Sequence, residues 1–343
     1  MLKQLIVKRF KSIKEATVTL SRLNLFVGAN SAGKSSAIQA LMLALDNNMI
    51  GSDEQLCEMV HVRTSSFNEL RCFVLNAKTF EIHLDDVPFI FRPADDNMIQ
   101  TTVQRNSEKE VEQTNILYLP AMRNADLSHV SINSSSRNNP LGRNGEYVID
   151  YYYNHRKDVL PQSIIVDKSL ETLEGQVNYW LNMLTGYKIQ VLLQGSEYQV
   201  QFEDPNKKML SPNHVGTGIS FIVELLIVCL SAKKGDAIII ENPEIHLHPS
   251  AQAAIIDFLA IIAANSSAQL FIESHSDHLF NGIRRLLHDE KLKLDDVSVY
   301  YFTRDENGLS SAQEVQLSQY GGLMNYIPGM FDQFDEDLDA ILK

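Results

Sequence analysis

Cysteine is scarce in this sequence. Its 343 residues include three cysteines, Cys57, Cys72 and Cys229, and no two of them form a C-x-x-C pair. A small, odd number of widely spaced cysteines excludes a disulfide framework and gives no sign of a zinc knuckle. We therefore expect reduced thiols and a chain that folds without covalent cross-links.

Long apolar runs are also missing. The longest apolar stretch, residues 219–230, is interrupted by Glu224 and is too short to span a bilayer. The first ten residues contain no apolar run of the length that a signal peptide needs. Apolar residues make up 44% of the chain and charged residues 21%, which is ordinary globular composition. We expect a soluble cytoplasmic protein without membrane contact, folded as roughly two domains or as one large domain with insertions.

Positive charge is in deficit. The chain has 30 Lys and Arg residues against 43 Asp and Glu residues, which gives a net charge of −13. Such a field repels phosphate backbones unless the basic residues gather on one face. Extensive coating of nucleic acid is therefore excluded, whereas a local DNA-binding track remains an alternative. Lys8, Arg9 and Lys11 are candidates to touch phosphate or DNA.

Hydrophobic patterns predict an α/β fold. Short apolar and β-branched runs predict strands at 5–7, 17–20, 23–27, 80–84, 87–93, 115–120, 237–241, 269–274 and 298–302. Helical periodicity predicts helices at 34–45, at 167–184 with Trp180 in the core, and from Pro249 onward. A hairpin is expected at 188–203 and a long loop at 128–145. We therefore expect a mixed core sheet flanked by helices, with an antiparallel β subdomain between about residues 49 and 115.

One motif predicts nucleotide binding. Residues 28–35, GANSAGKS, satisfy G-x-x-x-x-G-K-[ST] and lie between a predicted strand and a predicted helix, which is the context that the motif requires. Glycine at 28 and 33 lets the backbone turn tightly and direct its N–H groups at phosphate. Lys34 should reach the β and γ phosphates of ATP, and Ser35 should bind Mg²⁺. The predicted nucleotide-binding residues are Gly28, Ala29, Asn30, Ser31, Ala32, Gly33, Lys34, Ser35 and Ser36.

Acidic residues follow a later buried strand. Glu241 ends the apolar run at 237–241, where a P-loop protein holds its metal, so Glu241 is the candidate Mg²⁺ ligand. Glu244 lies three residues further on and could orient the attacking water; solvated loop acids are the alternative. His246 and His248 could suggest zinc, but no third ligand is placed nearby.

Four segments carry a family resemblance. They are VKRFKSIKEATVTLSRLNLFVGANSAGKSS at 7–36, VGTGISFIVELL at 215–226, IIIENPEIHLHPSAQ at 238–252 and LFIESHSDHLFNGIRR at 270–285. Their order resembles the ABC-type ATPase heads of the SMC, RecF and OLD group, in the compact form of AAA-family ATPases of defence and repair systems. The resemblance implies a P-loop NTPase fold of ABC-ATPase type, with one head spanning residues 1–343.

The resemblance also implies an organisation of this head. We expect a nucleotide-binding core at about 1–48 and 188–302, a β subdomain with a core strand at 49–127, and a loop and helical insert at 128–187. Residues 303–343 resemble a small domain of unknown function that often closes this kind of ATPase.

The resemblance assigns roles to further residues. Gly216, Gly218 and Ser220 resemble the signature motif, at the start of a helix that would face the γ-phosphate bound to the other subunit. His275 resembles the histidine switch, which hydrogen-bonds beside the γ-phosphate. The expected catalytic residues are thus Glu244, Glu241 and His275.

Two further segments fit the resemblance. The pair His246 and His248 resembles the D-loop, which crosses the dimer interface. Arg123 resembles an arginine that often follows its strand in this group; a solvated loop arginine is the alternative.

The sequence departs from the family pattern after Glu241. A typical ABC ATPase has its catalytic glutamate there, whereas this chain has Asn242. Either Glu244 takes over the positioning of water, or hydrolysis is slow and the nucleotide acts as a structural switch; both remain open. The glutamine of the Q-loop is not identified, and Gln55 is only a guess.

The leading hypothesis is an ATP-hydrolysing subunit that forms a head-to-tail dimer, or a higher homo-oligomer, around ATP and Mg²⁺. By resemblance, it would regulate an effector encoded nearby, a nuclease or toxin, in an antiphage defence system. One alternative is a RecF-like DNA-repair or DNA-binding ATPase, against which the net charge argues. Another is a weakly hydrolysing ATP-gated scaffold or inhibitor. A metabolic kinase is disfavoured because no phosphate-acceptor site is recognisable.

Overall fold

The computed structural model describes the chain except residues 52, 65, 95–98, 108, 110, 113, 124–126, 128, 129, 131, 133–140, 196, 332 and 343. Much of the loop predicted at 128–145 therefore lies outside the described residues. The helices are α1 (Lys34–Asp46), α2 (Phe67–Leu70), α3 (Val148–His155), α4 (Leu173–Thr185), α5 (Thr217–Ser231), α6 (Pro249–Asn265), α7 (Asp277–His288) and α8 (Gln333–Leu342), with short 3-10 turns at Pro212–His214 and Leu294–Asp296.

The strands form one large mixed sheet and one small sheet. The large sheet contains β1 (Gln4–Phe10), β2 (Ile13–Thr19), β3 (Leu23–Gly28), β4 (Gln55–Leu56), β5 (Phe80–Leu84), β6 (Val87–Pro93), β7 (Thr101–Arg105), β8 (Ile116–Leu119), β12 (Ala237–Glu241), β13 (Gln269–Glu273), β14 (Val297–Arg304) and β15 (Ser310–Glu314). The small sheet contains β9 (Lys188–Gln194), β10 (Glu197–Glu203) and β11 (Met209–Leu210), in the order β11-β10-β9.

The large sheet has a parallel half and an antiparallel half. Its twelve strands lie in the order β4-β7-β6-β5-β1-β2-β15-β14-β3-β13-β12-β8. Strands β14, β3, β13, β12 and β8 run parallel to one another, whereas the neighbours from β4 to β2 are antiparallel. Parallel strands that are buried on both faces read as continuous apolar runs, as AIIIE and QLFIE do here. The predicted mixed sheet with an antiparallel β subdomain is confirmed.

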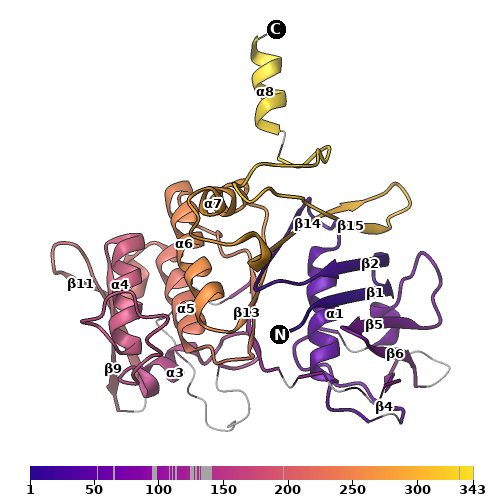
Figure 1. Ribbon diagram of the computed structural model, residues 1–343. Helices are drawn as coiled ribbons and strands as arrows, with labels where there is room; N and C mark the ends of the chain where they lie inside the picture. Colours follow the sequence, from indigo (N-terminus) through magenta and orange to yellow (C-terminus); the bar gives the residue numbers. More distant parts are fainter. Residues whose placement is uncertain are drawn as a thin grey trace.

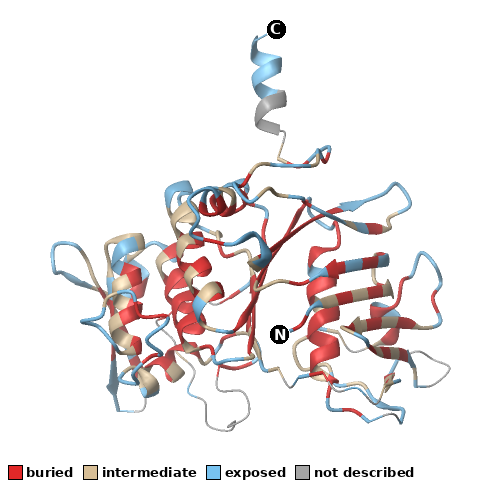
Figure 2. Cartoon of the chain, viewed as in Figure 1, coloured by how far each residue is buried: buried red, intermediate tan, exposed pale blue. Residues whose placement is uncertain are grey.

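Helix α1 fills the space between the two halves of this sheet. Figure 1 shows it between the parallel strands and the β1, β2, β5 and β6 strands. Buried and more exposed side chains alternate along β1 and β5. The buried ones pack on α1, together with Phe26 and Phe271 from the parallel half. Because apolar neighbours surround it, α1 is buried along most of its length (Figure 2).

The other face of the parallel strands carries the remaining helix layer. Helices α5, α6 and α7 cover this face, and α3, α4 and the small sheet join the same core (Figure 1). Trp180 of α4 is buried and meets Phe258 of α6 edge-on, with ring centroids 5.1 Å apart, so its predicted core position is confirmed. Helix α4 begins at Leu173, later than expected, because the Thr172 hydroxyl accepts a hydrogen bond from Gly175 N and caps the helix there.

The C-terminal residues return to the core before they leave it. After β15 the chain folds back onto α7, where Arg284 Nε donates to the carbonyl oxygen of Gly321 at 2.8 Å and Phe331 stacks on Phe280. Helix α8 then projects away from the body (Figure 1). Among the described helices, none combines the length and the apolar character needed to cross a membrane.

The close approach at Gly321 generates a test of this docking. Gly321 has a φ of +73°, and a Cβ there would lie 2.1 Å from the carbonyl oxygen of Arg284. We expect Gly321→Ala to lower the free energy of unfolding by about 1–3 kcal/mol, because both the backbone conformation and the contact become strained. Urea denaturation measures this loss. Gly51→Ala is the control, since a Cβ at Gly51 meets nothing within 4 Å; equal stability of the two variants would contradict the expectation.

Candidate functional site

The loop between β3 and α1 has a conformation that requires glycine. Gly28 has a φ of 142°, and a Cβ there would lie 2.3 Å from the backbone oxygen of Phe302. Gly33, the residue before α1, has a φ of 107°, and a Cβ there would lie 2.7 Å from Ser310 Cβ. A side chain at either position would collide with β14 or β15. The loop therefore turns tightly and leads directly into the first turn of α1.

Lys34 lies inside this loop. Its side chain is 2% exposed, and its Nζ donates to the carbonyl oxygens of Gly28 at 3.0 Å and Ala29 at 2.8 Å. Burial lowers the pKa of Lys34, while the carboxyl groups of Glu273 and Glu244 raise it. The ammonium group is thus held at the end of β3, where the N–H groups of α1 begin.

A cavity of about 260 Å³ adjoins the loop. Its lining includes residues 31–36 and also Lys11, Ser12 and Arg304. Of the three basic residues predicted near the loop, Lys11 lines this cavity. Lys8 and Arg9 instead form ion pairs with Glu15 and Glu81. Arg304 was missed because it lies at the end of β14, far from the motif in sequence. Gln55 lies in edge strand β4, at the far end of the sheet order from β8.

Two glutamates end neighbouring parallel strands. Glu241 of β12 and Glu273 of β13 are register partners and therefore project from the same face of the sheet. Glu241, the predicted Mg²⁺ ligand, accepts hydrogen bonds from Tyr118 Oη at 2.8 Å and from Ala121 N at 3.0 Å. The hydroxyl of Ser35 donates to Glu273 Oε1 at 2.8 Å. The acid in contact with Ser35 is thus Glu273, which the sequence reasoning did not select although it ends a buried strand next to His275.

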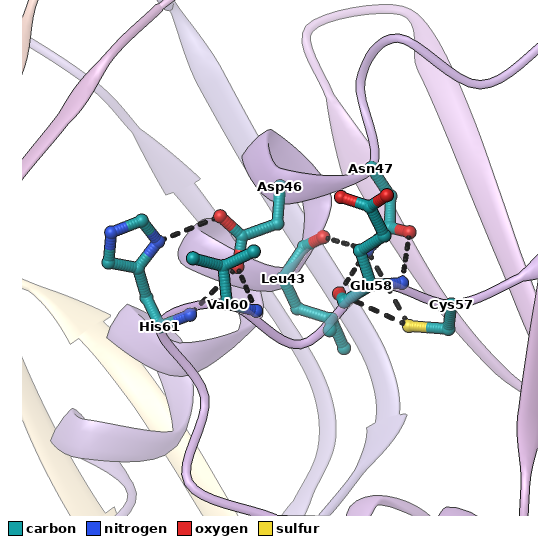
Figure 3. A network of polar contacts seen from close by, with 7 residues as sticks. All are labelled: Leu43, Asp46, Asn47, Cys57, Glu58, Val60 and His61. Atoms are coloured by element: carbon teal, nitrogen blue, oxygen red, sulfur yellow. Dashed lines mark hydrogen bonds and ion pairs between the residues drawn. The ribbon is translucent and has the colours of Figure 1, made fainter. Parts of the chain in front are cut away.

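Tyr118 connects Glu241 to the far end of α1. Its ring meets His61 edge-on, with centroids 6.5 Å apart. Asp46, the last residue of α1, binds His61 Nδ1 at 2.8 Å and accepts from the backbone N–H groups of residues 60 and 61 (Figure 3). The neighbouring Asn47 holds Glu58 by two hydrogen bonds to its backbone. Residues 58–61, which follow α1, are therefore fixed to the end of the helix by hydrogen bonds. In this position the ring of His61 packs against the ring of Tyr118.

Glu244 lies where β12 and β13 end. Its Oε1 accepts from Ser274 Oγ at 2.8 Å and from His275 N at 2.9 Å, and its Oε2 is buried without a hydrogen-bond partner. Burial and the charge of Lys34 lower the pKa of His275, while Glu244 and a hydrogen bond with the backbone of Gly28 raise it. Lys34, Glu244 and His275 therefore lie together beside the loop at Gly28. A pair of solvated loop acids is not what the structure shows.

Asn242 shapes the turn after β12 and provides no carboxylate at the position where the family pattern has a glutamate. It has a left-handed backbone with a φ of 46°, and its N–H donates to the carbonyl oxygen of Glu273 at 2.8 Å. The guanidinium of Arg123 donates to the carbonyl oxygens of Glu241 at 3.2 Å and Asn242 at 3.3 Å. Arg123 is 8% exposed, so it is a buried residue that supports the turn and is not a solvated loop arginine.

The residues that resemble a signature motif lie at the start of α5. Gly216 precedes the helix and is exposed. A Cβ at Gly218 would lie 2.6 Å from the carbonyl oxygen of His246, so α5 packs directly against the turn after β12. Ser220, which the resemblance placed among the nucleotide-binding residues, is 1% exposed, so its side chain is not accessible in the single chain. Every residue of α5 from Ser220 to Leu230 is buried, so the helix has no exposed face over this range.

Neither histidine of the H-x-H pair is arranged for zinc. His246 stacks on Phe221, and His248 Nδ1 accepts from Ser250 N as the cap of α6. Within the described part of the chain, no group of three or more His, Cys, Asp or Glu side chains could hold a metal ion. The three cysteines are free thiols, as expected.

Comparisons with known proteins agree with this geometry. Residues 23–281 match the model of a family described as "AAA domain, putative AbiEii toxin, Type IV TA system". The chain belongs to this AAA-domain family. Residues 292–341 match a second family, described as a protein of unknown function, DUF3696. No curated protein matches the sequence.

Solved structures identify the fold of this AAA-domain protein. A crystal structure described as the SmcHead bound to the C-winged helix domain of ScpA has a TM-score of 0.60 and 14% identity, covering 93% of this chain and 98% of that chain. A second crystal structure is described as the Smc head domain with an extended coiled coil bound to the C-terminal domain of ScpA derived from Pyrococcus furiosus. It has a TM-score of 0.60 and 12% identity, and the match covers 100% of this chain and 99% of that chain. The fold expected from the resemblance, that of an SMC head, is confirmed.

A buried acid of this AAA-domain protein lies on α5. Glu224 is 5% exposed, and its Oε2 has no hydrogen-bond partner. Burial raises the pKa of Glu224 to about 8, although the charge of Arg123 lowers it. Arg123 also lies over the ring of Phe221, with its guanidinium carbon 5.1 Å from the ring centroid. Arg123 therefore connects the turn after β12 with one face of α5.

Glu224→Gln tests this burial through the pH dependence of stability. Because the pKa of Glu224 is raised from 4.5 to about 8 on folding, the folded chain keeps a proton that the unfolded chain releases. The contribution of the protonated Glu224 to the free energy of unfolding is therefore complete below about pH 4.5, and it is lost as the pH rises towards 8. We expect the wild type to lose more stability than Glu224→Gln between about pH 5.5 and about pH 8.5, measured by urea denaturation. Glu197→Gln, at an exposed position of β10, should follow the wild type. Parallel profiles for wild type and Glu224→Gln would contradict the expectation.

Proposed function

We propose that this chain is an ATPase subunit that binds ATP with Mg²⁺ at Gly28–Ser35 and hydrolyses it between two copies arranged head to tail. The convergence of Lys34, Glu244 and His275 at the end of β3 carries the proposal. Membership of an AAA-domain family and the SMC-head fold support it.

The residues present suit phosphoryl transfer to water. That reaction is accelerated mainly by positioning and by positive charge on the transferred phosphate. Lys34 and the N–H groups at the start of α1 provide fixed positive charge. Glu244 Oε2, buried and without a partner, is available to orient a water molecule and to accept its proton. His275, whose lowered pKa keeps it mostly neutral near pH 7, is available to hydrogen-bond a phosphate oxygen.

Mg²⁺ would enter this site with the nucleotide and neutralise phosphate charge. Proteins hold Mg²⁺ with one or two carboxylates together with the phosphates of the substrate. The Ser35 hydroxyl and the neighbouring carboxyl groups of Glu273 and Glu241 fit this donor set. One carboxyl oxygen, Glu273 Oε2, is buried without a partner, as expected for an acid that awaits a cation.

The position of α5 supports a second copy as part of the site. Helix α1 packs on one face of the parallel strands and α5 on the other. The exposed start of α5 at Gly216 therefore lies across the sheet from the phosphate loop of its own chain. A helix N-terminus binds anions, so Gly216 of one copy would meet the γ-phosphate held by the other copy, in a dimer or a higher homo-oligomer.

The output of such a subunit would be regulatory. The two SMC heads compared above are described in complexes with domains of ScpA, which supports a protein partner for heads of this fold. The family description names a toxin and a type IV TA system, which supports a defence setting. We therefore place the protein in the cytoplasm, where it would regulate a nuclease or toxin encoded nearby during antiphage defence.

One observation favours a second candidate, an ATP-gated scaffold or inhibitor that hydrolyses ATP weakly. Asn242 occupies the position of the usual catalytic glutamate, and its side-chain oxygen is buried without a partner. A RecF-like DNA-binding role has less support, because the net charge is −13 and both Lys8 and Arg9 are engaged by acids.

ATP binding and turnover by Lys34→Ala test the site. Loss of the buried cation should weaken ATP binding by about tenfold to a hundredfold, the effect of removing a hydrogen bond to a charged group. Isothermal titration calorimetry and phosphate release measure the two quantities. Lys188→Ala, at an exposed position of β9, is the matched control and should bind as the wild type does. Unchanged binding by Lys34→Ala would reject Gly28–Ser35 as the ATP site.

Glu244→Gln separates the two candidate functions. In a hydrolysing dimer, this variant should bind ATP, lose turnover and accumulate as an ATP-dependent dimer, observed as a doubled mass in solution. Turnover equal to that of the wild type, with a mass that does not respond to ATP, would reject Glu244 as the residue that orients water. That result would favour nucleotide as a structural ligand.

A further inference from the structure

Helix α8 carries exposed apolar side chains. Ile341 and Leu342 follow Leu338 by three and four residues, so the three side chains lie on one side of the helix. All three are exposed, Ile341 by 79%. The residues of α8 include four acids and no Lys or Arg. Neighbouring apolar side chains on an exposed helix face are typical of a surface that binds another protein, and here the acids favour a partner with basic residues.

A cavity of about 450 Å³ lies where α5 and α6 end, and we call it the α5–α6 cavity. Its lining includes the buried side chains of Leu160, Leu173 and Leu230. Val159, next to Leu160 in the chain, is 66% exposed. The cavity therefore offers apolar surface to a ligand that brings apolar side chains.

Lysine residues give the α5–α6 cavity a positive rim. Lys233 and Lys234 line it and are exposed. Neither of them forms an ion pair within the described part of the chain. The described lining residues include one acid, Asp158, which binds His155 Nδ1 at 2.8 Å. A ligand that combines apolar side chains with acidic groups therefore complements the cavity in both respects.

Helix α8 and the α5–α6 cavity lie at opposite edges of the parallel strands. Residues 232–234 and 265–267 of the cavity lead into the amino ends of β12 and β13. The chain enters α8 after Phe331, which stacks on Phe280 near the start of α7, and α7 follows the carboxyl end of β13. Figure 1 shows α8 projecting on the side opposite α3, a helix that lines the cavity. Helix α8 is therefore directed away from the cavity of its own chain.

We propose that α8 of one copy of this chain occupies the α5–α6 cavity of a second copy. In this contact the apolar side chains of α8 cover the leucines of the cavity, and Asp339 lies near Lys233 and Lys234. A membrane surface is disfavoured, because anionic lipid headgroups would repel the acids of α8.

The contact joins two different surfaces. A copy whose α8 is occupied still has a vacant cavity, so association continues beyond two copies to a ring or a filament. No nucleotide takes part in it. The contact therefore goes beyond the proposed ATP-dependent dimer and does not rest on it.

The mass of the chain in solution without nucleotide tests the contact. Sedimentation velocity follows wild type over a range of concentrations, alongside Ile341→Asp and the double variant Lys233→Glu with Lys234→Glu. Wild type should assemble beyond two copies. Each variant should need a concentration higher by about tenfold or more, because Ile341→Asp removes apolar contact and the double variant places like charges against each other.

Two matched controls carry the same charge changes elsewhere. Ala340→Asp adds an acid to the other side of α8, since residues two positions apart do not share a helix face. Lys207→Glu with Lys208→Glu reverses another pair of consecutive exposed lysines. Both controls should assemble as wild type does. Every substituted position is exposed, so all variants should keep the wild-type circular dichroism spectrum.

A mixture of the two defective variants distinguishes this contact from a symmetric one. The Ile341→Asp chain keeps its cavity, and the chain with Lys233→Glu and Lys234→Glu keeps its α8. Together they can form one complete contact and no more. The mixture should therefore form pairs that stop at two copies, at concentrations at which each variant alone is a monomer.

A wild-type chain that stays monomeric at high micromolar concentration would overturn the proposal. Loss of assembly in only one of the two variants would also overturn it, as would a mixture that forms no pairs. Because ATP is absent throughout, failure of ATP binding leaves these results unchanged. Failure of this contact likewise leaves the proposed ATP site in place, so the two results are distinguishable.

Discussion

The parallel alignment of β3, β13 and β12 is the constraint on which the site depends. Because the three strands run in the same direction, their carboxyl ends lie at one edge of the sheet, and the residues that follow them are brought together. The phosphate loop lies more than two hundred residues before the turn from Asn242 to Glu244 and the Ser274–His275 turn. Hydrogen bonding between adjacent strands, and not local sequence, makes them neighbours.

Electrostatics at this edge is unusual for a site that we propose to bind a polyanion. One buried ammonium group, that of Lys34, faces the carboxyl groups of Glu244 and Glu273, and Glu241 lies one strand further away. Burial, together with the charges of Glu241 and Glu244, raises the pKa of Glu273 to about 7, although the Ser35 hydrogen bond and the charge of Lys34 lower it. A nucleotide without a metal would add further negative charge, so the arrangement favours ATP that arrives with a divalent cation.

Local features of the chain were predictable, and pairings between distant segments were not. The strands at 23–27, 237–241 and 269–273, helix α1 and the phosphate loop follow from apolar runs, periodicity and glycine spacing, which are short-range signals. Helix α3 and strands β7 and β15 lack a clear pattern and were missed. The contact of Ser35 with Glu273 depends on the order and register of three strands. The burial of Ser220 and Arg123 depends on how α5 packs against the turn after β12, so neither could be derived from the sequence alone.

The tight contact at Gly218 has a mechanical consequence. Since the backbone of α5 lies against the carbonyl oxygen of His246 with no side chain between them, the start of α5 and the turn that carries Glu244 are packed directly against each other. Arg123 joins both parts by its hydrogen bonds to the turn and its position over Phe221. In a head-to-tail pair, a displacement of Glu244 in one site would therefore move the helix end that completes the other site. The two sites would then be coupled by the joint movement of α5 and this turn, and not by rearrangements along a chain of flexible side chains.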